Sequence, residues 1–273
     1  MNGPTATLDE TKPGARARRF VRAAEMVILF WLIPIGFTLW RRRPDAVTDL
    51  LDRVTGLSVP LLRHPNGLLL PTLAAFTIVC LVWLLLDRRF ARRELWNWRG
   101  ARAQLRPISM IALPMLEVLV LLSWQLSPGS WLHDTLDASD ATRWMVWPGS
   151  RLFSLPRERP ELWLKIMLFY PVVSVWPQEV LYRAFFFHRY ACVLRRPWAR
   201  VLGSALAFGF MHVLFLNAVA PLLTFTGGVL FAWTYERSRS TLACSIEHAI
   251  YGCWVFTVGL GAYFYGGTIY VDR

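Results

Sequence analysis

The chain has 273 residues, of which 55% are hydrophobic and 14 are tryptophan, and its mean hydropathy is +0.37. Soluble domains seldom combine such a composition with long uncharged apolar runs, so the sequence excludes an ordinary soluble protein and indicates a polytopic membrane protein. The formal net charge of +12 comes almost entirely from arginine. Because the arginine clusters flank the apolar runs, we interpret this charge as cytoplasmic anchoring and expect no nucleic-acid partner.

Apolar runs of the length that crosses a bilayer recur along the whole chain. They occupy residues 24–40, 67–86, 108–126, 162–193, 199–217, 219–235 and 244–265. Since a crossing takes roughly 20 residues, we expect an all-α, polytopic transmembrane helical bundle of about seven to eight spans. The run at 162–193 is too long for one straight crossing, and Pro171 and Pro177 are expected to kink it.

Three segments follow from this pattern. Residues 1–23 are expected to be a polar, basic N-terminal tail, residues 24–160 the N-terminal transmembrane helices and loops, and residues 161–273 a helical core. The N-terminus and the basic segment 87–106 are both expected in the cytoplasm, because cytoplasmic loops are enriched in lysine and arginine.

Five ionisable residues interrupt the apolar runs, namely Glu117, Glu179, Arg183, His212 and His248. A charge in hydrocarbon costs at least ~2.5–3.5 kcal/mol, so these groups are expected to face the bundle interior and to meet one another. Glu179 and Arg183 are four residues apart, which places them on one helix face in the better order for an ion pair. At a rise of ~1.5 Å per residue, Glu179, His212 and His248 reach similar depths of roughly 13–18 Å.

Less specific interpretations of these residues stay open. The pair Glu179–Arg183 could simply neutralise itself and stabilise the bundle, and a single histidine in an apolar helix is commonly an interhelical hydrogen bonder. Glu117 has two interpretations, either as a member of the cluster or as the group that neutralises Arg183. A transporter is a further alternative, because buried ionisable groups also mark proton paths.

Three short motifs, in order and at helical spacing, resemble those of one family. They are Gln178-Glu179-x-x-x-Arg183, Phe208-x-x-x-His212 and His248-x-x-x-Gly252. The family is the CPBP intramembrane proteases, which include type II CAAX prenyl endopeptidases and bacteriocin-processing relatives, and its patterns are EExxxR, FxxxH and HxxxN or a small residue. The resemblance covers residues 165–265 and makes 161–273 a CPBP-like catalytic core.

The resemblance implies hydrolysis of a peptide bond within or at the membrane. Carried over to this chain, it makes Glu179, or its neighbour Gln178, the water-activating base together with His212. It likewise makes His248 the oxyanion donor and Arg183 the orienting partner.

Two positions depart from the family's patterns. Gln178 stands where the first glutamate is expected, and glutamine cannot take a proton. Gly252 stands where an asparagine amide is expected, for which Tyr251 or a backbone N–H would have to compensate. A catalytically silent relative that binds or protects a membrane partner is therefore kept as the alternative.

The sequence leaves the cofactor open between none and zinc. There is no HExxH motif and no thiolate set, but Glu179, His212 and His248 could hold zinc with a water in the fourth position, and we favour the metal-free form. The expected partners are the lipid bilayer and a membrane protein or peptide substrate, with the oligomeric state open. The expected location is the cell inner membrane, multi-pass, with the N-terminus in the cytoplasm and the site opening toward the cytoplasm.

Overall fold

Helices make up nearly all of the described chain, residues 13–55 and 65–264 of the computed structural model, and no strand occurs in that part. The expected all-helical fold is confirmed. In the first half the helices are α1 Pro13–Val27, α2 Ile33–Arg42, α3 Pro44–Thr55, α4 Leu69–Leu86, α5 Trp98–Gln125, α6 Trp131–Asp137, α7 Asp140–Val146 and α8 Ser154–Glu158. In the second half they are α9 Pro160–Tyr170, α10 Trp176–Glu179, α11 Phe186–Arg189, α12 Pro197–Met211, α13 Val219–Ser238 and α14 Thr241–Val258.

Four helical segments in the described part are long and apolar enough to cross a membrane. They are Gly14–Arg42, Leu69–Leu86, Trp98–Gln125 and Pro197–Phe215. The other apolar runs are helical as well, at α9–α11, α13 and α14, but polar residues such as Glu247 and His248 lower the hydropathy of these segments. The helical membrane bundle is thus confirmed, whereas length and composition alone support four of the expected spans.

The segment predicted as an N-terminal tail, residues 1–23, includes the start of a helix. Residues 1–12 lie outside the described part, but α1 already begins at Pro13 and continues through a π-helical turn at Ile28–Leu32 into α2. Arginine is a good helix former, so the basic sequence extends the helix beyond its apolar stretch. The same applies to α5, which begins ten residues before the apolar run, with the Asn97 side chain accepting from the N–H of Gly100 at 3.1 Å.

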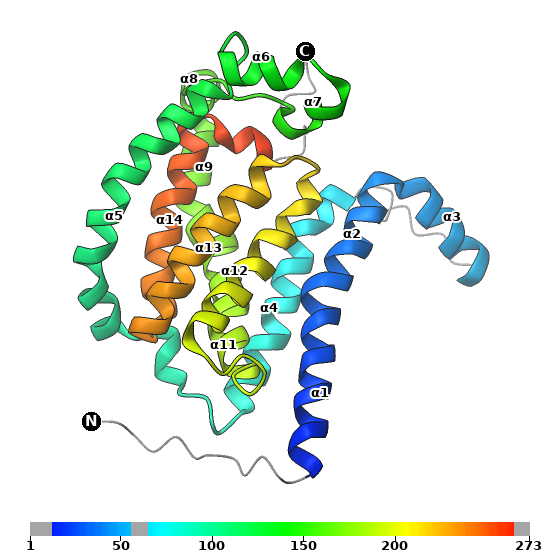
Figure 1. Cartoon of the computed structure of the whole chain (residues 1–273), viewed down its shortest axis with the longest axis vertical. Helices are drawn as coiled ribbons and strands as arrows, with labels where there is room; N and C mark the ends of the chain where they lie inside the picture. Colours follow the sequence, from blue (N-terminus) through cyan, green and yellow to red (C-terminus); the bar gives the residue numbers. More distant parts are fainter. Residues whose placement is uncertain (1–12, 56–64, 265–273) are drawn as a thin grey trace.

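Three helices, α12, α13 and α14, stand side by side in the middle of the bundle, with α5 on one flank and α1 and α2 on the other (Figure 1). Short helices α6, α7 and α8 cover one end (Figure 1). Phe30 of the N-terminal helices and Leu84 of α4 belong to the same buried cluster as Phe186 and Tyr235. The segment before residue 160 and the segment after it therefore share one hydrophobic core.

Two π-helical turns interrupt the long helical run from α9 to α11. One begins at Pro171 and ends at Val175, and the other spans Val180–Phe185. A proline lacks the N–H for the α-helical bond and its ring collides with a carbonyl of the preceding turn, so a wider turn at Pro171 accommodates it. Gln178 and Glu179 lie in α10, between the two wide turns.

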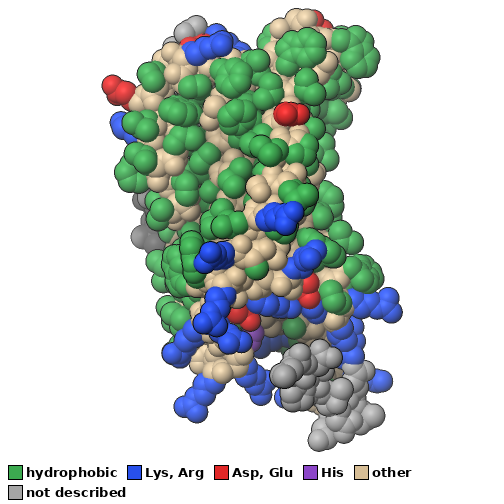
Figure 2. All heavy atoms as spheres, turned by 90° about the vertical axis from the view of Figure 1, so that its left-hand side faces the viewer, with side chains coloured by type: hydrophobic (Ala, Val, Ile, Leu, Met, Phe, Trp, Pro, Cys, Tyr) green, Lys and Arg blue, Asp and Glu red, His purple; other side chains and the backbone are tan. Residues whose placement is uncertain are grey.

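The two ends of the bundle differ in charge. The arginine-rich end, defined here as residues 13–25, 87–106, 188–200 and 236–239, carries 17 arginines and four acidic residues. The capped end, defined as residues 41–55 and 126–161, carries eight arginines and eight acidic residues. Figure 2 shows the basic side chains gathered toward the lower end of a largely hydrophobic face. Exposed tryptophans occur at both ends, as in the interfacial belts of membrane proteins.

Candidate active site

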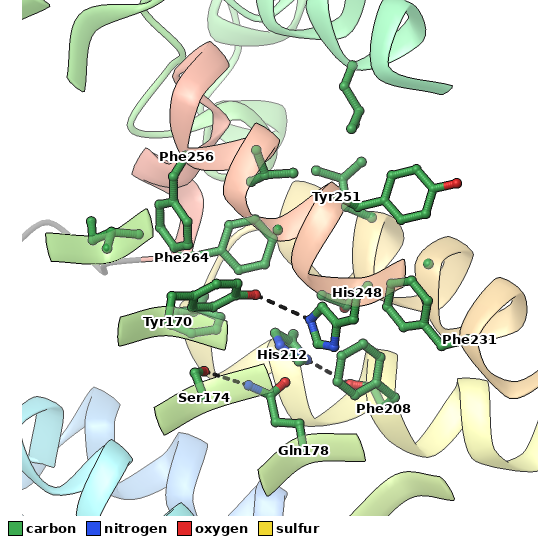
Figure 3. A pocket seen from close by; sticks show the side chains of 18 of the residues that line it. Tyr170, Ser174, Gln178, Phe208, His212, Phe231, His248, Tyr251, Phe256 and Phe264 are labelled. Atoms are coloured by element: carbon green, nitrogen blue, oxygen red, sulfur yellow. Dashed lines mark hydrogen bonds between the residues drawn. The ribbon is translucent and has the colours of Figure 1, made fainter. Parts of the chain in front are cut away.

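A cavity of about 450 Å³ lies inside the bundle, between the α9–α10 run and helices α12, α13 and α14. Its walls are mostly leucine, valine and phenylalanine side chains. Polar side chains interrupt these walls, and five of them lie near one another (Figure 3), namely Tyr170, Ser174, Gln178, His212 and His248. Lys165, Thr224, Thr226 and Tyr251 also line the cavity. Such a pocket, apolar with a few convergent polar groups, is the usual form of a small binding or catalytic site.

Glu179 is the centre of a buried polar network behind the cavity wall. One carboxylate oxygen, Oε1, lies 2.9 Å from Nδ1 of His248, and the other, Oε2, lies 3.1 Å from Nε of Arg183. The side chains of Glu179 and Arg183 are both 0% exposed. The expected ion pair on one helix face is therefore present, and it extends to an imidazole on α14.

Arg183 has further partners that compensate for its burial. Its Nη1 donates to the hydroxyl of Ser204 at 2.5 Å, and that hydroxyl donates to the carbonyl of Tyr182 at 2.6 Å. The guanidinium carbon lies 5.2 Å from the ring centre of Phe208 and 5.8 Å from that of Phe231, within the range of cation–π attraction. The charge is thus held by one carboxylate, one hydroxyl and two aromatic faces.

His248 is fixed in both position and tautomer. Its ring stacks on Phe231 at 4.6 Å with an interplanar angle of 14°, and Phe208 meets it edge-on at 5.5 Å. Because a carboxylate only accepts, Nδ1 of His248 carries the proton that it donates to Glu179. Nε2 is the nitrogen left to face the cavity, where it lies 3.2 Å from the hydroxyl of Tyr170 (Figure 3).

His212 occupies the cavity wall at the point where α12 gives way to a 3₁₀ turn, His212–Phe215. Its Nδ1 lies 2.7 Å from the carbonyl oxygen of Phe208. A carbonyl oxygen is only an acceptor, so Nδ1 carries the proton and Nε2 carries a lone pair. Phe208 thus links the second and third motifs, since its carbonyl orients His212 and its ring packs against His248.

The carboxylate pairs with a different histidine from the one expected. The resemblance implied that Glu179 and His212 would act together, but Glu179 contacts His248, and among the described residues no hydrogen bond joins it to His212. Gln178 lines the cavity instead, and its Nε2 donates to the hydroxyl of Ser174 at 2.7 Å. Adjacent helical residues point about 100° apart, so Glu179 cannot take the place of Gln178 in the cavity.

Two other acidic residues do not join the cavity. Glu117 is exposed on α5, so both predicted roles for it, in the cluster or as the partner of Arg183, are wrong. Helix rotation places Met115 and Leu119 of α5 on the cavity wall and Glu117 on another face. Glu247 of α14 is 1% exposed and does not line the cavity.

The residues do not form a zinc-binding set. No group of three or more His, Cys, Asp or Glu side chains within residues 13–55 and 65–264 is arranged to hold a metal ion. Both oxygens of Glu179 are occupied, by Arg183 and by His248, so the carboxylate does not join the Nε2 atoms of the two histidines as a third ligand. A zinc ligand set requires three donor atoms directed at one ion, which this geometry does not provide.

Gly252 marks the most crowded point of the site. A Cβ atom at this position would lie 2.5 Å from both the hydroxyl oxygen and Cε1 of Tyr170. Motif spacing singled out position 252 but gave no indication of Tyr170, which lies on α9 outside all three motifs. Ser204 and Phe231 were missed for the same reason.

The cavity extends toward the capped end of the bundle. Its outer lining comes from the start of α4, the turn after α12, the start of α13 and the last described turn, at Leu69, Leu70, Phe215, Leu223 and Phe264. On the opposite side Phe187 and Tyr235 are buried with their rings 5.0 Å apart, which closes the site toward the arginine-rich end. The cavity thus leads away from the end at which α1 begins.

Comparison with known proteins supports the resemblance. The family model described as type II CAAX prenyl endopeptidase Rce1-like matches residues 160–254. Residues 160–254 are thus similar to an Rce1-like domain, which is consistent with the CPBP intramembrane protease type, and the resemblance drawn from the three motifs is confirmed over this stretch. The match covers about a third of the chain and contains all three motifs. A search of curated proteins and a search of solved structures each returned no match.

The buried ion pair of Glu179 and Arg183 predicts how two variants change the free energy of unfolding. Arg183→Met leaves the Glu179 carboxylate buried without its cation and is expected to destabilise the fold by about 3–5 kcal/mol. The double variant Glu179→Gln/Arg183→Met removes both charges and is expected to regain part of that loss. Unfolding in detergent micelles measures both values; equal stability of Arg183→Met and the wild-type protein would contradict the network.

Proposed function

We propose that the protein is an intramembrane endopeptidase that hydrolyses a peptide bond of a membrane-associated protein or peptide. The observation that carries the proposal is the pairing of Glu179 with His248 at the wall of a cavity that His212 also lines. Two imidazoles with a carboxylate behind one of them, in a cavity within a membrane bundle, provide acid–base groups where water is otherwise scarce. The family match over residues 160–254 supports the same class of reaction.

His212 is the general base in this proposal. Its Nε2 has the lone pair, because Nδ1 donates to Phe208, and the ring lines the cavity. The oxygen of a water molecule bonds to the scissile carbonyl carbon while its proton moves to Nε2, and the π pair of the carbonyl becomes a lone pair of the oxyanion. When the C–N bond breaks, the amine nitrogen takes that proton, which leaves a carboxylic acid and an amine.

His248 stabilises the oxyanion in this proposal, and Glu179 acts through it. The carboxylate 2.9 Å from Nδ1 holds the ring so that Nε2 faces the cavity. Arg183 keeps the carboxylate in place from the other side at 3.1 Å. Glu179 and Arg183 are therefore positioning residues, and Gln178 contributes a polar amide to the cavity rather than a base.

We also propose that the reaction needs no metal ion. The Nδ1 atoms of both histidines are occupied by a carboxylate and a carbonyl, and Glu179 is occupied by Arg183 and His248. The carboxylate is thus not available as a third metal ligand beside the two Nε2 atoms. The mainly apolar walls favour an apolar stretch of chain as substrate, consistent with a membrane protein or membrane-inserted peptide.

A catalytically silent, partner-binding protein is the second candidate. In its favour, the first motif contributes Gln178 to the cavity wall, and a glutamine cannot act as a base. In that case the cavity would bind an apolar segment without cleaving it. The two candidates differ in whether water is consumed.

We propose further that the protein lies in the cell inner membrane with the arginine-rich end in the cytoplasm. The imbalance of 17 arginines against four acidic residues at that end, and the balance of eight against eight at the other, support this orientation. The cavity then opens in the outer half of the membrane. A substrate segment would enter from that half rather than from the cytoplasm.

Hydrolysis is expected when the purified protein is reconstituted in liposomes with a panel of single-span membrane peptides. In water enriched in ¹⁸O, mass spectrometry should detect one heavy oxygen in each new carboxyl terminus. His212→Ala, His248→Ala and Glu179→Gln should each lower the rate, His212→Ala by about 10²–10⁴-fold.

Two results would decide against the enzyme. Cleavage that is unchanged in all three variants would remove these residues from the reaction. Wild-type protein that is inactive until Gln178→Glu supplies a carboxylate would favour the silent, binding protein instead.

The maleimide reactivity of a native cysteine tests the proposed orientation of the protein in the membrane. Cys192 is exposed at the arginine-rich end, so a membrane-impermeant maleimide should label it in inverted vesicles and not in intact spheroplasts. On a Cys192→Ser background, Thr224→Cys places a thiol on the cavity wall and should react from the outer side. Labelling of both thiols from the same side would contradict the proposed access route.

A further inference from the structure

Arg41, near the end of α2, lies against the turn that carries His212. Its Nη1 donates to the carbonyl oxygen of Leu214, and its guanidinium carbon lies 5.8 Å from the ring centre of Phe215. Both partners belong to the 3₁₀ turn His212–Phe215 at the end of α12. A helix of the N-terminal segment thus contacts the residues that directly follow the proposed base.

The end of α12 needs a hydrogen-bond donor from another part of the chain. Carbonyl groups at the end of a helix have no partner within that helix, and Leu214 is buried, so its carbonyl oxygen has little access to water. The guanidinium of Arg41 supplies N–H donors in one plane, and its positive charge suits the C-terminal end of a helix. In the proposed orientation Arg41 lies on the outer side, where basic residues are disfavoured, so this contact gives it a role that membrane orientation does not.

The contact continues from Phe215 to the imidazole of His212. The centres of these two rings are 5.7 Å apart, and Phe208 meets the same imidazole edge-on at 4.8 Å. The side chain of Asn217 donates to the carbonyl of Phe215 at 3.2 Å, so the carbonyls of Leu214 and Phe215 both accept from side chains outside the turn. The direction of the His212 ring therefore depends on how this turn is held.

We propose that Arg41 is a positioning residue for His212, and that α2 thereby completes the active site. The proposal rests on the proposed hydrolase function and deepens it. Arg41 lies outside the stretch that the family model matches, residues 160–254, and does not line the cavity. It touches no reacting atom: it holds the turn, and the turn holds the ring whose Nε2 accepts the proton from water.

Cleavage by the reconstituted protein tests this role. Arg41→Met removes the donor and the charge, and it should lower kcat by about 10–10²-fold with KM nearly unchanged, because the base is displaced while the cavity walls remain. The matched control is Arg42→Met, which removes an exposed arginine from the same end of α2 and should leave kcat unchanged. Thermal unfolding shows whether each variant is folded.

A conservative variant keeps the test valid if Arg41→Met does not fold. Arg41→Lys retains a charged N–H donor but lacks the planar guanidinium, so it should fold and lose less activity than Arg41→Met. Its loss should again fall on kcat rather than on KM. A change confined to KM would place Arg41 in substrate binding and overturn the positioning role.

A double-variant cycle separates positioning from a general contribution to the fold. In a His212→Ala background the base is already absent, so Arg41→Met should cause no further loss of the residual rate. A general contribution to the fold would instead lower the rate by the same factor in both backgrounds.

The imidazole can also be observed without turnover. In ¹⁵N NMR spectra of the histidine-labelled protein in micelles, Arg41→Met should change the resonances of His212 and leave those of His248 nearly the same. Arg42→Met should change neither.

The outcomes separate this inference from the function itself. Active wild-type protein in which Arg41→Met behaves like Arg42→Met, or loses the same factor in the His212→Ala background, overturns the role of Arg41 and leaves the hydrolase in place. Wild-type cleavage that is absent, or that is unchanged in His212→Ala, overturns the hydrolase and this inference together.

Discussion

The burial of one carboxylate and one guanidinium in an apolar bundle is the constraint on which the site depends. Glu179 and Arg183 are both 0% exposed, and an unpaired charge in such surroundings costs several kcal/mol. Each charge therefore needs the other, and each needs a further polar partner. Ser204 supplies that partner to Arg183, and His248 supplies it to Glu179. The helices α12 and α14 are thereby fixed against the α9–α11 run at the level of the cavity.

The same pairing separates the polar network from the cavity. Glu179 and Arg183 lie behind the wall, whereas Gln178, one residue earlier, lies in it. Among the polar side chains of the described residues, the imidazole of His248 alone belongs to both, since Nδ1 contacts the carboxylate and Nε2 faces the cavity. The His248 ring thus links the buried ion pair to the cavity. Phe208 and Phe231 hold this ring at a fixed angle.

The direction of the cavity depends on the same arrangement. The buried polar pair and the aromatic residues beneath it, Phe187 and Tyr235, fill the interior on the side of the arginine-rich end. The cavity lies on the other side of the histidines, toward the capped end. An enzyme with this orientation would meet the part of a membrane segment that lies in the outer half of the bilayer.

Much of the architecture was predictable from the sequence, because long apolar runs form helices whatever their neighbours are. Spacing also predicted that Glu179 and Arg183 share a helix face, since that depends on the geometry of one helix alone. The histidine that contacts Glu179 could not be predicted, because the choice between His212 and His248 depends on how separate helices rotate and pack. Glu117 was misplaced for the same reason. Tyr170 was missed because its link to Gly252 is a contact between helices that no motif contains.

The contact between Glu179 and His248 can be measured directly by ¹⁵N NMR of the histidine-labelled protein in micelles. The account predicts that Nδ1 of His248 is protonated and strongly hydrogen-bonded. It also predicts that Glu179→Gln changes the resonances of His248 while those of His212 stay nearly the same. A change at His212 with none at His248, or no change at either ring, would contradict the account.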